Sequence, residues 1–74
     1  MTKAFSGREK ELIRKRLINK GKELFARYGL IKTGVRDLTK AAGIAQGSFY
    51  NFFQSKEELY FEIIEQEEEI IKEK

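Results

Sequence analysis

The sequence predicts an all-α domain in which a three-helix helix-turn-helix unit is followed by the start of a fourth helix. Apolar residues recur at three- and four-residue spacings along most of the chain, which is the period of an amphipathic helix. Proline is absent, so glycine provides the breaks, and four glycines divide the middle of the chain into short segments: Gly29, Gly34, Gly43 and Gly47. A Ser-x-x-Glu capping pattern then marks the beginning of the last helix.

The first helix is predicted from about Arg8 to Tyr28. Its apolar stripe has helical spacing and includes one glycine: Ile13, Leu17, Gly21, Leu24, Phe25 and Tyr28. We expect Gly29 to end this helix in the left-handed αL conformation. Residues 1–7 show no periodicity, so we expect them to form a flexible arm.

Two short helices are predicted next, with a tight turn at Gly43 and Ile44 between them. The first of the two contains about two turns and is too short to be stable without packing. Its apolar residues are Val35, Leu38, Ala41 and Ala42. The other is predicted from about Gln46 to Phe52, and Phe49, Phe52 and Phe53 provide aromatic bulk for the core.

The dimensions of these two helices favour a helix-turn-helix, in which two helices meet at a steep angle across a short turn. The small Thr39 lies where the helices should cross, and Gly43 permits a positive φ in the turn. We expect Leu38, Ile44 and Phe49 to pack between the helices. The alternative is an ordinary helical hairpin inside a bundle.

The fourth helix is predicted to begin at the capping pattern Ser55-Lys56-Glu57-Glu58. Its apolar residues keep helical spacing up to the end of the sequence: Leu59, Tyr60, Ile63, Ile64, Ile70 and Ile71. No stop signal follows them. We therefore expect the natural chain to continue beyond this helix.

The composition excludes several classes of protein. The chain has 74 residues, which suffice for one small domain but not for a sizeable ligand cavity as well. It contains no cysteine and no histidine, so the usual nucleophile, base and metal ligands of an enzyme are missing and no cofactor is expected. Cysteine usage indicates the reducing cytoplasm, and no apolar segment is long enough for a signal peptide or a membrane span.

The charge is distributed unevenly along the chain. Residues 1–56 contain thirteen Lys or Arg and four acids, a balance of +9, whereas residues 57–74 contain two Lys and eight Glu, a balance of −6. A basic body with an acidic tail indicates that the body faces a polyanion. The alternative is that these charges only solvate helix faces.

From about Leu17 to Ile64 the sequence resembles the N-terminal domain of tetracycline-repressor (TetR) family regulators. The stretches that carry the resemblance are LINKGKELFARYG, TGVRDLTKAAGIAQGSFYNFF and QSKEELYFEII. The resemblance implies a helix-turn-helix DNA-binding domain at residues 8–54, after the arm at 1–7. Residues 55–74 would then form a connecting helix that leads to a C-terminal ligand-binding and dimerisation domain absent from this sequence.

The resemblance also implies roles for individual residues. Bases of double-stranded operator DNA would be contacted from the third helix by Gln46, Gly47 and Ser48, because side chains at this end of a recognition helix reach base edges. Phosphates would be contacted by Thr33, Arg36, Tyr50, Asn51 and Lys56. Lys56 resembles the family's phosphate clamp at the beginning of the fourth helix, and Lys3, Lys10 and Arg14 could assist.

Four residues depart from the family's pattern. Ala45 stands where a serine N-cap is common, so the recognition helix lacks a side-chain acceptor worth about 1 kcal/mol. Gly21 and Thr39 stand at positions often filled by alanine, and Gly34 replaces a frequent threonine. These departures affect the rigidity of the motif and the identity of the operator, rather than the class of protein.

The function that follows is a sequence-specific DNA-binding domain of a regulator, a repressor released by a small-molecule inducer and a homodimer at full length. One alternative is a helical protein-interaction module that uses an apolar edge of the fourth helix formed by Leu59, Ile63, Ile70 and Ile71. A basic amphipathic helix lying on a membrane is another. An enzyme is not expected.

Overall fold

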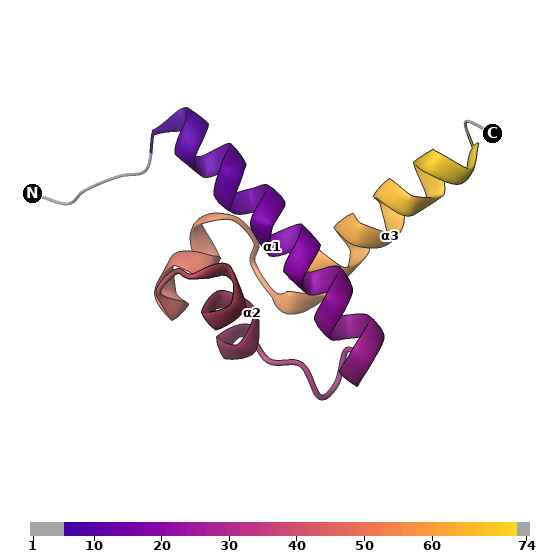
Figure 1. Ribbon diagram of the computed structural model, residues 1–74, viewed down its shortest axis with the longest axis horizontal. Helices are drawn as coiled ribbons and strands as arrows, with labels where there is room; N and C mark the ends of the chain where they lie inside the picture. Colours follow the sequence, from indigo (N-terminus) through magenta and orange to yellow (C-terminus); the bar gives the residue numbers. More distant parts are fainter. Residues whose placement is uncertain (1–5, 73–74) are drawn as a thin grey trace, which may run out of the picture.

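The computed structural model describes residues 6–72, with the side chains of residues 6–67, and contains only helices in this part of the chain. In chain order these are α1 (Gly7–Tyr28), α2 (Val35–Ala42), the 3₁₀-helix η1 (Gln46–Asn51) and α3 (Lys56–Lys72). Figure 1 shows α2 and η1 together on one side of α1, and α3 leaving in a different direction. The prediction of an all-α fold is confirmed. Within the described residues no helix is long and apolar enough to cross a membrane.

Helix α1 begins with a capping box that the sequence analysis did not identify. The Ser6 hydroxyl accepts from the Glu9 amide at 3.1 Å, and the Glu9 carboxylate accepts from the Ser6 amide at 3.1 Å. Two amides of the first turn are thereby satisfied. The helix thus begins within the arm expected for residues 1–7, of which residues 1–5 lie outside the described part.

The two glycines with positive φ end their helices differently. At Gly29 φ is 88° and ψ is 162°, so the prediction of an αL conformation there was wrong, although the Gly29 amide still donates to the Phe25 carbonyl at 2.9 Å. At Gly43 φ is 78° and ψ is 30°, which is αL as the tight turn requires. The turn between α2 and η1 therefore depends on glycine at residue 43.

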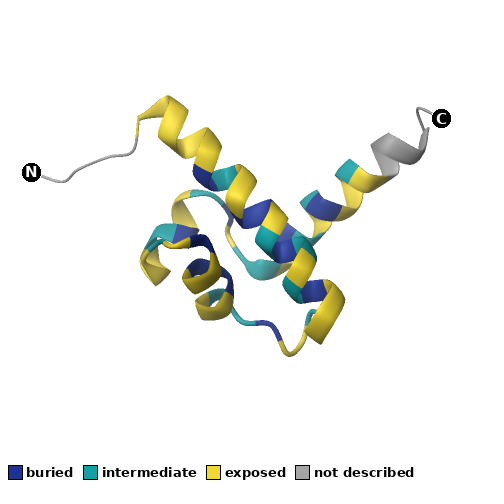
Figure 2. Cartoon of the chain, in the orientation of Figure 1, coloured by how far each residue is buried: buried dark blue, intermediate teal, exposed yellow. Residues whose placement is uncertain are grey.

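The core lies where α1 passes the other helices, whereas the first turns of α1 are exposed (Figure 2). Its buried apolar members come from all four helices and the segment after η1: Ile13, Leu17, Ile18, Phe25, Leu38, Ala42, Phe49, Phe53, Leu59 and Ile63. Phe49 is fully buried, and its ring lies 5.8 Å from that of Phe53. Tyr28, predicted on the apolar stripe of α1, is instead 54% exposed.

Helices α1 and α3 cross closely at Gly21. A Cβ atom on this glycine would lie 2.9 Å from Ile63 Cδ1 and 3.2 Å from Leu59 Cδ2, so the hydrogen of glycine makes the contact possible. Phe25 and Tyr60 continue the same contact edge-to-face, with ring centroids 5.3 Å apart. The absence of a side chain at Gly21 thus leaves room for Ile63 and Leu59 against α1.

The helix-turn-helix is formed by α2, the turn at Gly43 and η1. Thr39 is 2% exposed, and its hydroxyl donates to the Val35 carbonyl at 3.1 Å, which satisfies a polar group at the crossing. Arg16 of α1 donates to the Ala42 carbonyl at the end of α2. Leu38 and Phe49 are buried, and Ile44 packs against the same core, as predicted.

The recognition segment is a 3₁₀-helix over Gln46–Asn51, rather than a helix to Phe52. The Ser48 amide donates to the Ala45 carbonyl and the Phe52 amide to the Phe49 carbonyl, which are three-residue spacings. Ala45 has an extended backbone, with φ −70° and ψ 150°, and makes no side-chain cap, as its departure from the family's pattern predicted. The segment therefore depends on packing for its position.

Of the two hydrogen bonds in the predicted capping box at the beginning of α3, one is present. The Ser55 hydroxyl accepts from the Glu58 amide at 3.2 Å, but the Glu58 carboxylate accepts from Gln54 rather than Ser55. Of the apolar edge considered for protein interaction, Leu59 and Ile63 are buried against α1. The side chains of Ile70 and Ile71 lie outside the described residues. Two of the four residues of the apolar edge considered for protein interaction therefore belong to the core.

We expect Gly21→Val to lower the free energy of unfolding by about 1–3 kcal/mol, because the added isopropyl group, beginning with its Cβ, must displace the side chains of Ile63 and Leu59. Gly7→Val is the matched control in the same helix, since a Cβ there meets no atom within 4 Å. Urea denaturation followed by circular dichroism measures both. Equal stabilities of the two variants would show that α1 and α3 do not approach each other in this way.

We expect Ala45→Ser to raise the free energy of unfolding by about 0.5–1 kcal/mol, because a serine hydroxyl at this N-cap would accept from an amide of the first turn of η1. Ala26→Ser makes the same chemical change at an exposed position in the last turn of α1, where serine lowers helix stability by up to about 0.5 kcal/mol. Thermal unfolding compares the two variants. Shifts in the same direction would contradict the capping role of residue 45.

Candidate nucleic-acid interface

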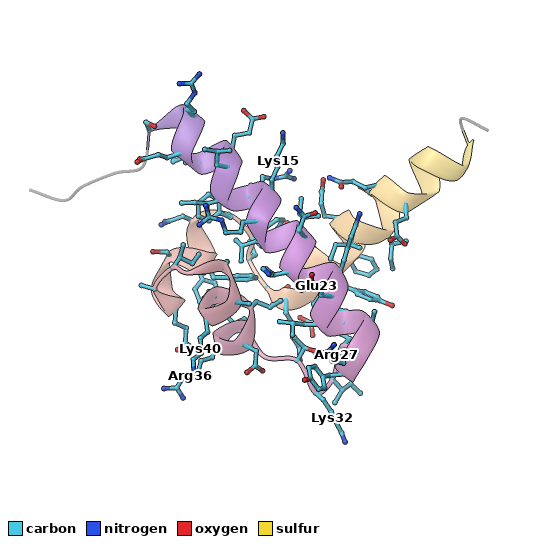
Figure 3. The ribbon with its side chains drawn as sticks, viewed as in Figure 1. Lys15, Glu23, Arg27, Lys32, Arg36 and Lys40 are labelled. Carbon is cyan, nitrogen blue, oxygen red and sulfur yellow. The ribbon has the colours of Figure 1, made fainter. Side chains whose placement is uncertain are left out.

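A shallow hollow lies between α2 and η1 on the outside of the domain. It is lined by Arg36, Thr39, Lys40, Ile44 and Gln46. Arg36 and Lys40 are one helical turn apart, both are exposed, and Figure 3 shows their side chains extending outward from α2. Two cations and a glutamine amide therefore border the same depression. This combination suits a duplex, whose phosphates are anionic and whose base edges carry hydrogen-bond donors and acceptors.

The three residues predicted to contact bases lie at the beginning of η1. Gln46 and Gly47 are exposed and Ser48 is half-buried. Because residues three apart eclipse each other in a 3₁₀-helix, Gly47 lies in line with Tyr50, and Ser48 with Asn51. The predicted base contacts and two of the predicted phosphate contacts are thus neighbours on the surface of one short element.

Tyr50 and Asn51 lie at the end of η1 and are exposed, Tyr50 by 57%. The Tyr50 ring stands edge-to-face on Phe49, with centroids 5.4 Å apart. Phe49 is buried, so this contact holds the ring of Tyr50 against the core while most of the residue remains accessible. A phenol held in this way can donate to a phosphate at little cost in side-chain entropy.

Lys40 was not predicted as a DNA contact, although its spacing from Arg36 in the sequence indicated that role. It follows Arg36 by four residues in a helix whose other face carries Leu38 and Ala42. That spacing places the two cations on one exposed face. Arg36 was predicted to contact a phosphate, but this prediction was not extended to the next cation on the same face.

Thr33 does not lie where a phosphate could reach it. It is 1% exposed, and its hydroxyl donates to the Gly29 carbonyl at 2.8 Å. Its backbone precedes α2, which begins at Val35. The side chain predicted to bind phosphate instead holds the connection between α1 and α2.

The ammonium of the half-buried Lys56 is bound to backbone carbonyls of the connection between α1 and α2. Its Nζ lies 2.8 Å from the Leu30 carbonyl oxygen, 3.0 Å from that of Thr33 and 3.3 Å from that of Ile31. An ammonium has three hydrogens, so these carbonyls can occupy all of them. In this arrangement Lys56 offers no donor to a phosphate.

Arg14, considered as an assisting cation, is engaged within the domain. Its guanidinium lies 3.0 Å from the Glu62 carboxylate and stands 5.5 Å from the centre of the Phe53 ring. Lys10 is exposed, and Lys3 lies outside the described residues. Among the side chains of residues 6–67, no group of three or more acidic, histidine or cysteine residues could hold a metal ion.

Residues 17–63 match the family described as bacterial regulatory proteins, tetR family. The repressor KstR2 of Rhodococcus jostii is 44% identical over 63 residues, which is 85% of this chain and 28% of that protein. The repressor DhaR of a Mycobacterium species is 44% identical over 45 residues, 61% of this chain and 23% of DhaR. The uncharacterised regulator YdgC of Bacillus subtilis is 41% identical over 51 residues, 69% of this chain and 26% of YdgC.

No solved structure matches this chain significantly. The chain spans about a quarter of the length of these curated relatives. All three are described as helix-turn-helix transcriptional regulators, which act by binding DNA rather than by catalysis. The family match covers more than half of the chain and includes α2, the turn and η1. The chain therefore belongs to the tetR family of bacterial regulatory proteins and contains its helix-turn-helix DNA-binding domain.

Proposed function

We propose that this domain is the operator-reading part of a dimeric bacterial repressor, released from DNA by a small molecule that binds outside these residues. The repressor function is supported by the descriptions of KstR2 and DhaR, which share 44% of the aligned residues. Dimerisation and the inducer site belong, in this proposal, to a further domain reached through α3. The protein would act in the cytoplasm, where its operator lies.

The observation that carries the proposal is the hollow in which Arg36 and Lys40 adjoin Gln46. Cations alone would bind any polyanion, and a glutamine alone would bind weakly. Together they supply both of the functions that operator binding needs, because phosphate contacts fix the register of the protein and base contacts read the sequence.

We assign the base contacts to Gln46, Gly47 and Ser48. The glutamine amide can pair in bidentate fashion with adenine, and the serine hydroxyl can donate to or accept from either kind of base pair. Gly47 has no atom within 4 Å of the position that a Cβ would take, so its surface is open to a base or a sugar. The first residues of η1 would therefore enter the major groove.

We assign the phosphate contacts to Arg36, Lys40, Tyr50 and Asn51, which flank the base-reading residues on α2 and at the end of η1. Thr33 and Lys56, expected on phosphates from the resemblance, are left out, because Thr33 is buried and the Lys56 ammonium is bound to backbone carbonyls in the DNA-free chain. The two cations would release counterions from the duplex and so give a salt-dependent affinity.

A protein-interaction module on α3 is the alternative. It is favoured by two exposed apolar residues, Phe61 at 63% and Ile64 at 37%. The same two residues also suit a contact with the rest of the proposed repressor. Generic duplex DNA at low and high salt discriminates between the two functions, because only the DNA-binding domain should show a steep salt-dependent affinity.

We expect Gln46→Ala and Arg36→Ala to weaken DNA binding by the full-length repressor in two different ways. Gln46→Ala should weaken operator binding by about 1–3 kcal/mol and spare random DNA, because it removes a bidentate base contact. Arg36→Ala should weaken both to a similar degree and lower the salt slope by about one unit, because one phosphate contact is lost.

Fluorescence anisotropy across a salt series measures both variants on an operator selected from random duplexes, and circular dichroism checks their helicity. Lys15→Ala, an exposed lysine on α1 away from α2 and η1 (Figure 3), is the control and should change neither quantity. If Gln46→Ala and Arg36→Ala reduced operator and random binding in the same proportion with equal slopes, the assignment of roles would be wrong.

We expect the operator to be two-fold symmetric, because two recognition segments of a dimer must enter major grooves roughly 34 Å apart, or a multiple of that distance. Footprinting of the full-length repressor on the selected sequence should protect two inverted half-sites. Inverting one half-site should abolish tight binding while leaving binding to random DNA unchanged. Protection of one asymmetric half-site at saturation would rule out the symmetric dimer.

A further inference from the structure

A second hollow is formed by the end of α1, the connection between α1 and α2, and α2 itself. Its lining includes Lys32 of the connection and Lys40 of α2, together with Tyr28, the last residue of α1. Lys40 also lines the hollow that contains Gln46. The two hollows therefore share one lysine, and the cations that border them extend from η1 to the connection.

The cations of this border are not engaged within the domain. Lys32, Arg36 and Lys40 follow one another at intervals of four residues, and all three are exposed. None of their side chains makes a hydrogen bond or an ion pair within the part of the chain that the structure describes. Figure 3 shows Lys32 extending away from the domain, as Arg36 and Lys40 do from α2. Each can meet a phosphate without giving up a described contact.

The lining of the second hollow has a net positive charge. Its acidic residue is Asp37, whose carboxylate accepts from the Gly34 amide at 3.0 Å and is thus engaged at the beginning of α2. Two lysines face this one aspartate. The other lining residues are neutral or apolar: Leu24, Tyr28, Thr33 and Ala41. Lysine stems can lie along such a surface while their ammonium groups reach an anion outside it.

The three cations are spread over more than one phosphate. At about 1.5 Å per residue, Arg36 and Lys40 lie roughly 6 Å apart along α2. Lys32 lies outside the helix, which begins at Val35. Successive phosphates of one DNA strand are about 3.4 Å apart along the duplex axis. A strand that follows α2 can therefore present a separate phosphate to Lys32.

We propose that the DNA-binding surface extends beyond the helix-turn-helix onto the connection between α1 and α2, where Lys32 binds a duplex phosphate separate from those of Arg36 and Lys40. This inference rests on the proposed function and adds a contact from outside the motif. Because a phosphate contact carries no sequence information, Lys32 raises the affinity for operator and random DNA alike. A cation beyond the end of α2 also helps to fix the orientation of that helix on the strand.

An acidic protein segment is the other anion that such a lining suits. The duplex is favoured because Lys40 borders both hollows, so a strand in contact with the recognition segment lies beside the second hollow as well. A separate protein partner would compete with the operator for Lys40. The observations therefore favour one continuous surface for DNA.

The test compares Lys32→Ala, Lys32→Arg and Arg27→Ala in the full-length repressor, on operator and random duplexes across a salt series. Lys32→Ala should weaken binding to both duplexes about threefold to tenfold at low salt and lower the salt slope by about one unit, because one phosphate contact is lost. Lys32→Arg keeps the charge and should recover the lost unit of slope. Circular dichroism checks the helicity of each variant.

Arg27→Ala is the matched control. Arg27 is exposed in the last turn of α1, close to Lys32 in the sequence, but it lines a different hollow together with Glu23. Its substitution removes the same charge from the same end of the domain and should leave affinity and salt slope unchanged. Equal losses in Lys32→Ala and Arg27→Ala would show a general effect of net charge and overturn the proposal.

Operator duplexes in which one phosphate at a time is replaced by a neutral methylphosphonate locate the contact. In the wild-type repressor, each replacement at a phosphate bound by a cation should weaken binding. One of these replacements should have no effect on Lys32→Ala, and a different one should have no effect on Arg36→Ala. The proposal is also overturned if the two positions coincide, or if no replacement loses its effect in Lys32→Ala.

Failure of this inference can be distinguished from failure of the proposed function. If the wild-type repressor shows no salt-dependent DNA binding, the proposed function is wrong, and the inference that rests on it is wrong too. If the wild type binds its operator and Lys32→Ala binds with the same affinity and slope, only the Lys32 contact is wrong. The second hollow would in that case suit an acidic protein segment rather than DNA.

Discussion

The burial of Phe49 connects the DNA-facing surface of this domain to its core. The recognition segment η1 has six residues, three-residue hydrogen bonds and no side-chain N-cap, so its own hydrogen bonds cannot keep it folded. Phe49 is fully buried, and Phe53 follows it into the same core. Because Gln46, Gly47 and Ser48 lie on the same short element, their positions depend on how firmly that ring is packed.

The core in turn depends on how closely α1 and α3 approach each other at Gly21. Leu59 and Ile63 fill the space that a side chain on residue 21 would take. The same helix α3 begins at Lys56, whose ammonium reaches the connection before α2. A displacement of α3 would therefore affect both the packing beneath α1 and the beginning of α2.

Basic residues in this domain divide into two groups that the sequence alone does not separate. Arg16 donates to the Ala42 carbonyl, Arg14 pairs with Glu62, and Lys56 binds three carbonyls, so these cations act within the fold. Arg36 and Lys40 point outward beside η1. Positive charge in this domain therefore does not by itself identify a phosphate contact, because some of its cations are bound to carbonyls or carboxylates within the fold.

The sequence predicted what depends on periodicity and on local backbone chemistry. The helices followed from apolar spacing, the turn from Gly43, and the buried ring from the position of Phe49 in the motif. Ser6 and Glu9 carried a capping signature that could have been recognised, since their spacing is the same as that of Ser55 and Glu58. The hydrogen bonds of Lys56 could not be predicted, because the carbonyl oxygens that it meets lie 23 to 26 residues earlier in the chain and are brought near by the tertiary fold.

The dependence on the tertiary fold also explains why the exposure of Tyr28 and the burial of the edge of α3 were not predicted. Tyr28 continues the apolar spacing of α1, but it is the last residue of the helix and is 54% exposed. From the sequence, Leu59 and Ile63 were considered for contact with a partner protein. In the structure they pack against Gly21 of α1 and belong to the core. Periodicity identifies which residues share a face of a helix, whereas the crossing of two helices decides how far along that face the burial extends. At this crossing, the missing side chain of Gly21 leaves the space that Leu59 and Ile63 occupy.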